Sequence, residues 1–278
     1  MVASVHLRAV KGLDRKLIAG LILGGIGLAC VFIAPVSLFV LVLALHLAAA
    51  GELFRIARGR GTRPVPLVGL AGVAAAFAVA YHENGRAPED LPAVAAAALL
   101  LAGAAVLLRR KREGAVVGVA VTAFVVVYVG LMGSYMIAMR GSPHGFRVVL
   151  VFGLMVVLND AGGWALGRAA GRHPFAPRVS PEKTWEGLLG GTALTFAVGL
   201  AAGAGLDPPM TVERGLILAA LVSITAPLGD LFESMLKRDF GVKDTGGVIP
   251  AHGGALDRLD SLIFSAPLFF YAFRALTS

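Results

Sequence analysis

Long apolar stretches recur along almost the whole chain, and they constrain its fold more than any other feature. Runs of about 17 to 25 apolar residues match the length that an α-helix needs to cross the hydrocarbon core of a bilayer. The composition agrees, because 57% of the 278 residues are hydrophobic and 15% are charged, against about 25% charged residues in a typical soluble domain. We therefore expect an all-α, polytopic integral membrane protein with no separate soluble domain.

The breaks between apolar runs predict about nine transmembrane helices in a single membrane domain, residues 1–278. The predicted spans are residues 17–34, 36–54, 65–81, 92–108, 115–139, 147–167, 187–205, 215–232 and 260–276. Two interpretations stay open at Pro35, because this proline either separates two spans or kinks one long helix. Residues 1–140 would form the N-terminal spans, and residues 141–278 carry the polar motifs.

The basic N-terminus followed by an apolar run is similar to a secretory signal, but the run is too long and no A-x-A cleavage pattern closes it. We therefore expect it to be the first span. The one cysteine, Cys30, lies inside this run, which excludes a disulfide framework and a thiol metal site.

Basic residues are distributed unevenly between the predicted loops. With nine spans, alternate loops carry four Lys or Arg residues each, and these five loops account for 20 of the 25 basic residues. The positive-inside rule then predicts a cytoplasmic N-terminus, cytoplasmic basic loops and an external C-terminus. The same distribution explains the formal net charge of +8. It argues against nucleic acid as a partner, which would require the basic residues to share one soluble face.

Residues 229–260 are far too polar for their surroundings. If the span near 215–232 continues as a helix, one face carries Asp230, Glu233, Ser234, Lys237 and Arg238. Carboxylates at an apolar boundary are costly unless they are paired or bind a cation. A glycine-rich stretch follows, whose backbone N–H groups can approach phosphate oxygens.

These residue types suit transfer of a nucleotidyl group, because attack of one phosphate on another requires a divalent cation and basic side chains. We expect Asp230 and Asp257 to bind Mg²⁺, with room for a second cation. The predicted catalytic cations are Lys237, Arg238 and Lys243, and Arg258 is a further phosphate partner. His252 could equally bind phosphate or make a structural hydrogen bond.

A second polar segment lies earlier in the chain. Asn159 and Asp160 fall inside an otherwise apolar span, where an unpaired Asp is expensive. Beyond them, Ser180 is a candidate N-cap for the next span, and Lys183 and Thr184 beside that helix N-terminus would attract a phosphate. By the span count, this segment and residues 229–260 share the cytoplasmic side.

The run Ser234-x-Leu236-Lys237-Arg238-x4-Lys243-Asp244-x-Gly246-x2-Ile249-Pro250-x-His252-Gly253-Gly254-x2-Asp257-Arg258-Leu259-Asp260 resembles the signature of bacterial phosphatidate cytidylyltransferases. The Asn159-Asp160 pair and the segment 180–187 also resemble family segments, so the resemblance covers roughly the C-terminal 45% of the chain. Ala255, Glu182 and the AGGW after Asp160 depart from the usual family pattern. Glu182 is therefore left out of the predicted site.

The resemblance implies transfer of CMP from CTP to phosphatidic acid, giving CDP-diacylglycerol and pyrophosphate, with Mg²⁺ required. It also implies carboxylates equivalent to Asp230 and Asp257 at the metal, a polar cavity open to the cytoplasm and to membrane lipid, and a homodimer. The predicted substrate-binding residues are Asn159, Asp160, Ser180, Lys183, Thr184, Glu233, Ser234, Asp244, His252, Gly253, Gly254, Arg258 and Asp260. Ser234 is expected to be a contact rather than a nucleophile, since the attacking phosphate is already an anion.

Three alternatives remain. A related transferase could use the same chemistry on an ether lipid or a polyprenol. A secondary transporter would also place carboxylates within spans, but it should show repeat-related halves, and these motifs all lie in the second half. A structural membrane protein has no use for such a polar loop.

Overall fold

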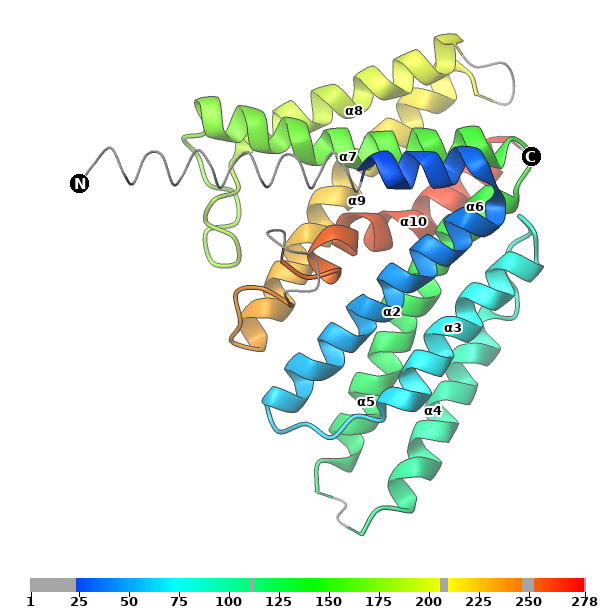
Figure 1. Ribbon diagram of the computed structural model, residues 1–278. Helices are drawn as coiled ribbons and strands as arrows, with labels where there is room; N and C mark the ends of the chain where they lie inside the picture. Colours follow the sequence, from blue (N-terminus) through cyan, green and yellow to red (C-terminus); the bar gives the residue numbers. More distant parts are fainter. Residues whose placement is uncertain (1–23, 111–112, 206–209, 247–252, 278) are drawn as a thin grey trace.

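The computed structural model describes residues 24–110, 113–205, 210–246 and 253–277. Within these ranges every named element is a helix, and an isolated β-bridge joins Pro174 and Thr184. Figure 1 shows α7 and α8 lying across the ends of a bundle formed by α2 to α6, with α9 and α10 between the two groups. The predicted all-α membrane fold is confirmed.

A first helical segment covers Gly24–Ile33. The remaining elements are α2 (Pro35–Gly59), α3 (Pro66–His82), α4 (Leu91–Leu107), α5 (Ala115–Val125), η1 (Val126–Met132), α6 (Gly133–Gly141), α7 (Gly145–Ala170), α8 (Trp185–Gly205), α9 (Val212–Asp239) and α10 (Leu256–Thr277). The η1 segment is a π-helix, and α5, η1 and α6 form one continuous apolar element, Ala115–Gly141.

Six of the described helices are long and apolar enough to cross a membrane: α2, the α5–η1–α6 element, α7, α8, α9 and α10. Three apolar helices are shorter, namely Gly24–Ile33, α3 and α4. Each predicted span overlaps one of these nine segments, but the number that cross the bilayer stays a prediction.

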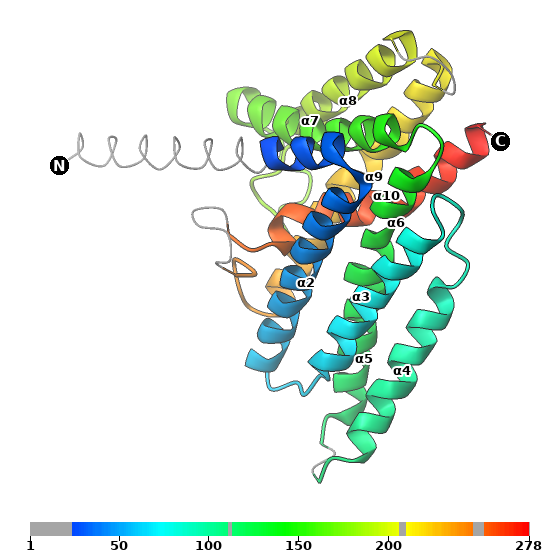
Figure 2. The same cartoon turned by 45° about the vertical axis from the view of Figure 1, so that its right-hand side comes forward.

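The helix is interrupted between Ile33 and Pro35. Ala34 is extended, with φ −163° and ψ 156°, and Pro35 occupies the first turn of α2. Proline suits that position because its missing N–H would have no partner inside the helix. Figure 2 shows the first helical segment turning sharply into α2. The alternative of one long helix kinked at Pro35 is therefore wrong.

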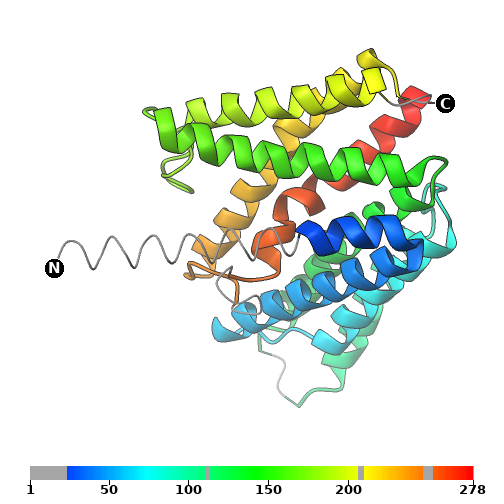
Figure 3. The ribbon, with the colours of Figure 1, turned by 45° about the horizontal axis from the view of Figure 1, so that its top comes forward.

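Glycines allow helices α7, α8 and α9 to pack closely against one another. A Cβ atom at Gly162 would lie 2.6 Å from the Gly190 carbonyl oxygen, and one at Gly199 would lie 2.5 Å from the Gly215 carbonyl oxygen. These contacts join α7 to α8 and α8 to α9, and Figure 3 shows α7 and α8 side by side along their length. Small residues permit such close approach of helices in membrane proteins.

The two helices that carry the polar motif extend beyond the predicted spans. Helix α9 continues to Asp239, about two turns past residue 232, which confirms that the polar face from Asp230 to Arg238 is helical. Helix α10 begins at Leu256 rather than at residue 260. A Cβ atom at Gly229 would lie 2.7 Å from the Asp260 carbonyl oxygen, so α9 and α10 cross closely beside the acidic residues.

Candidate active site

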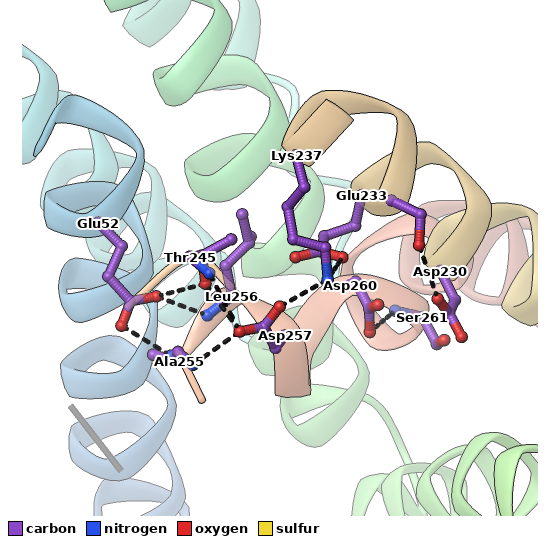
Figure 4. Close-up of polar contacts among 12 residues, drawn as sticks. Glu52, Asp230, Glu233, Lys237, Thr245, Ala255, Leu256, Asp257, Asp260 and Ser261 are labelled. Atoms are coloured by element: carbon purple, nitrogen blue, oxygen red, sulfur yellow. Dashed lines mark hydrogen bonds and ion pairs between the residues drawn. The ribbon is translucent and has the colours of Figure 1, made fainter. Parts of the chain in front are cut away.

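Three carboxylates meet where α9 and α10 cross. Asp230 and Glu233 come from α9 and Asp260 from α10, and one oxygen of each lies within 4.8 Å of the others. Glu233 is fully buried and Asp260 is 7% exposed, whereas Asp230 is half-buried (Figure 4). Three clustered carboxylates repel one another unless a cation lies among them, and oxygen ligands are what Mg²⁺ prefers. The donor set therefore fits a hard divalent cation.

Lys237 connects this cluster to Asp257. Its Nζ atom lies 2.5 Å from Glu233 Oε2 and 2.8 Å from Asp257 Oδ1. The Glu233 contact follows from the i, i+4 spacing on α9. The other oxygen of Asp257 accepts hydrogen bonds from the Gly254 N–H at 2.7 Å and the Thr245 hydroxyl at 3.0 Å. Asp257, predicted to share a metal with Asp230, thus lies outside the three-carboxylate cluster and has partners of its own.

Lys183 approaches the cluster from the loop between α7 and α8 and pairs with Asp230. This loop folds back on itself: the Phe175 N–H donates to the Lys183 carbonyl at 3.0 Å, and the Trp185 N–H donates to the His173 carbonyl at 2.9 Å. Glu186 accepts from the Arg172 N–H at 3.1 Å. The two polar segments, which the sequence predicted to share one side of the membrane, therefore meet in the structure.

The N-cap of α8 differs from the sequence prediction. Thr184, rather than Ser180, accepts the hydrogen bond from the Gly187 N–H, at 3.1 Å, which is the cap-to-N3 pattern. Ser180 lies four residues before this cap, where its carbonyl accepts from the Lys183 N–H. The prediction that Ser180 caps the helix is wrong because the bridge between Pro174 and Thr184 delays the helix start to Trp185.

Asn159 and Asp160 are neighbours on α7 but interact with different parts of the protein. Asn159 is buried and donates to the Thr195 hydroxyl on α8 at 3.0 Å, and a Cβ at Gly191 would lie 2.5 Å from the Asn159 carbonyl oxygen. Asn159 therefore holds two helices together. Asp160 interacts electrostatically with Asp230, Lys183 and Arg258, so it belongs to the charged site.

The other predicted residues surround this centre. The Ser234 hydroxyl lies 3.5 Å from Asp230 Oδ1. Arg238, Lys243, Asp244 and Arg258 are exposed near it, and Gly253 adopts a left-handed φ of +81°. The Gly254 N–H is directed at Asp257. His252 lies outside the described residues.

Three further residues belong to the neighbourhood, although the sequence reasoning did not select them. Glu52 on α2 is fully buried beside the N-terminus of α10, and Thr245 lies between Glu52 and Asp257. Tyr128 on η1 interacts electrostatically with Asp230, Glu233 and Asp260. A lone carboxylate within an apolar span was a usable signal for Glu52, whereas Tyr128 carried none.

The charges of the site define what it can bind. Asp230, Glu233, Asp257 and Asp260 face two ammonium groups, those of Lys183 and Lys237. With a cation present, the lysines are available to anionic oxygens, so the site suits phosphate esters.

Comparison with known proteins gives a consistent result. Residues 14–276 match the family model described as "Cytidylyltransferase family". The chain is 32% identical to the phosphatidate cytidylyltransferase of Mycobacterium leprae over 93% of this chain and 86% of that protein. It is 41% identical to that of Staphylococcus epidermidis over 51% of this chain and 54% of the relative. With the Mycobacterium bovis protein it shares 37% identity over 53% of this chain and 48% of the relative. The last two alignments thus span about half the length of those relatives.

Proposed function

Because this chain belongs to the cytidylyltransferase family, we propose that it is a phosphatidate cytidylyltransferase that transfers CMP from CTP to phosphatidic acid. The observation that carries this proposal is the cluster of Asp230, Glu233 and Asp260 beside Lys183 and Lys237. Such a site provides oxygen ligands for a cation and two basic groups for phosphates, at the polar end of helices that contact lipid.

The reaction requires no nucleophile from the protein. A phosphate oxygen of phosphatidic acid attacks the α-phosphorus of CTP, a new P–O bond forms, and the bond to the β-phosphate oxygen breaks so that pyrophosphate leaves. A bound Mg²⁺ would neutralise phosphate charge and orient the triphosphate. We assign this ion to the cluster of Asp230, Glu233 and Asp260.

Two lysines are proposed to bind substrate phosphates. Lys183 and Lys237 each contact a carboxylate now, and both would turn toward the triphosphate or the departing pyrophosphate as charge develops there. The two lysines come from different elements, the α7–α8 loop and α9, and they pair with different carboxylates of the cluster, Asp230 and Glu233. Arg238, Lys243 and Arg258 would attract the anionic substrates from the cytoplasm.

We also propose that the site faces the cytoplasm, with the N-terminus inside and the C-terminus outside. The ribbon supports this sidedness, since the flanks of the α2–α3, α4–α5, α7–α8 and α9–α10 connections lie toward one end of the molecule. The α3–α4 and α6–α7 connections lie toward the other end, as do the adjoining ends of α8 and α9 and the last turn of α10 (Figure 1). The predicted homodimer stays a proposal that rests on the resemblance.

The proposal is tested with purified protein in detergent, CTP labelled at the α-phosphate, Mg²⁺ and phosphatidic acid. Label should enter the lipid fraction only when phosphatidic acid is present. A matched reaction with diacylglycerol lacks the attacking phosphate and should give no labelled lipid. Equal labelling with polyprenyl phosphate in place of phosphatidic acid would instead support the related transferase.

A further inference from the structure

Glu52 is a carboxylate on the apolar helix α2, far in sequence from the polar motifs. It lies on α2 between Gly51 and Leu53, and it is fully buried. Among the described residues, no Lys, Arg or His forms an ion pair with it. Burying an ionised carboxylate costs several kcal/mol unless other groups compensate, so its partners indicate why it is there.

Those partners are the N-terminus of α10 and a hydroxyl. The Ala255 N–H donates to Glu52 Oε1 at 2.9 Å, the Leu256 N–H donates to Oε2 at 3.1 Å, and Thr245 Oγ1 lies 3.1 Å from Oε2 (Figure 4). The first N–H groups of a helix have no partner within the helix and carry partial positive charge. Glu52 thus caps α10 from a different helix, across 203 residues of sequence.

Two glycines leave room for this carboxylate. A Cβ atom at Gly246 would lie 2.5 Å from Glu52 Oε1, and one at Gly254 would lie closer still to Oε2. Both contacts are closer than any side chain permits. Gly246 precedes residues 247–252 and Gly254 follows them. The chain therefore packs against Glu52 of α2 both before and after this segment. The glycines therefore have a packing reason that is separate from phosphate binding.

A single hydroxyl separates Glu52 from the charged site. Thr245 Oγ1 lies 3.0 Å from Asp257 Oδ2, and Asp257 pairs with Lys237, which in turn contacts Glu233. The Gly254 N–H, one residue before Ala255, donates to the same Asp257 oxygen. A shift of the α10 N-terminus away from Glu52 would therefore move Asp257 relative to Lys237.

We propose that Glu52 is a positioning residue of the active site, which holds the N-terminus of α10 and Thr245 against α2 so that Asp257 faces Lys237. The inference deepens the proposed function and rests on it. Glu52 acts through Thr245 and Asp257 and does not itself touch substrate.

The test compares Glu52→Gln with His46→Gln. The glutamine side chain has the size of glutamate, but its NH₂ group would face a backbone N–H donor instead of accepting from it. His46 is a matched control because it is also fully buried on α2, where it bonds the Val42 carbonyl and contacts Gly133 rather than α10. Amide hydrogen exchange at Ala255 and Leu256, kcat and the KM for CTP are measured on folded, monodisperse protein.

Glu52→Gln should speed exchange at Ala255 and Leu256 by at least about tenfold and lower kcat by about 10- to 100-fold, as is typical when a group that orients a site residue is lost. The KM for CTP should change less than kcat. His46→Gln should leave both exchange at these amides and kcat per folded molecule close to wild type. Thr245→Val should lower kcat. Thr245→Ser keeps the hydroxyl and should retain most of the wild-type kcat.

Normal kcat in Glu52→Gln, or a lowered kcat with unchanged exchange at Ala255 and Leu256, would overturn the proposal. If Glu52→Gln does not fold, the pair Thr245→Val and Thr245→Ser decides, and equal kcat in the two would count against it. If the wild-type protein does not transfer CMP to phosphatidic acid, the proposed function fails on its own, and the exchange measurement still reports whether Glu52 holds α10.

Discussion

Lys237 on α9 and Asp257 on α10 form an ion pair, with Nζ 2.8 Å from Oδ1, and both side chains are largely shielded. Lys237 also contacts Glu233, so one ammonium group serves two carboxylates on two helices. The pair therefore fixes the crossing of α9 and α10 at the point where the acidic cluster lies. Asp257 is not one of the three carboxylates whose oxygens lie within 4.8 Å of one another, and Lys237 links it to Glu233, which is one of them. This arrangement leads to the first prediction.

Asp260→Asn and Asp257→Asn should differ in their response to Mg²⁺. Removing the Asp260 charge takes a ligand from the cluster, so turnover should fall by at least about two orders of magnitude and the Mg²⁺ concentration for half-maximal rate should rise. Asp257→Asn should lower turnover with a smaller change in Mg²⁺ dependence. The measurement is a Mg²⁺ titration at saturating CTP. Asp230→Asn serves as a positive control, because Asp230 is a metal ligand both in the pair predicted from the sequence and in the cluster of three, so its turnover should fall in either case.

An equal increase in Mg²⁺ requirement for Asp230→Asn and Asp257→Asn, with Asp260→Asn unaffected, would support the pair predicted from the sequence instead. Similar melting temperatures are the control that each variant is folded.

Lys183→Gln should raise the KM for CTP and lower kcat, because it removes one of the two ammonium groups beside the cluster. The value of kcat/KM should fall by at least about tenfold. The matched control is Arg178→Gln, which removes an exposed charge from the same loop. Steady-state kinetics of the two variants decide. Equal, small effects would mean that Lys183 only balances the charge of Asp230.

Asn159→Ala should affect stability more than catalysis. Its amide is buried and bonds Thr195, and leaving a buried partner unsatisfied costs about 1–3 kcal/mol. A lower melting temperature with kcat within about threefold of wild type is expected. Asp160→Asn should show the reverse pattern, since Asp160 interacts with the charges of the site. A normal melting temperature and a large loss of kcat in Asn159→Ala would place Asn159 at the substrate.

The helices and the polar face of α9 could be predicted from the sequence because they depend on local patterns. Apolar runs of sufficient length specify helices in a membrane, and the spacing of Asp230, Glu233 and Lys237 places them on one side of any helix. The prediction that α9 continues beyond the apolar run was confirmed for the same reason.

Contacts between distant parts of the chain could not be predicted in this way. Glu52 meets Ala255 because α2 packs beside α10, and nothing in the local sequence of either helix identifies the other. Choosing Ser180 as the helix cap failed for a related reason, since both Ser180 and Thr184 are good caps and the fold of the preceding loop decides between them. The π-helix at Val126–Met132 has the same apolar composition as an α-helix.

The predicted topology follows from the 20 basic residues on alternate loops. A reporter fused after Ser278 that is active only outside the cytoplasm should be active, and one fused at the connection between α4 and α5 should be inactive. The opposite result at the C-terminus alone would require an even number of spans, which would exclude one of the three short helices from the membrane.

The most direct test of the account uses two batches of CTP, one labelled at the α-phosphate and one at the γ-phosphate, each with phosphatidic acid and Mg²⁺. The account predicts that α-label appears in a lipid with the mass of CDP-diacylglycerol and that γ-label appears only in pyrophosphate. Asp230→Asn should give neither product above background. Transfer of γ-label to lipid, or no lipid labelling from either batch while a known phosphatidate cytidylyltransferase succeeds alongside, would contradict it.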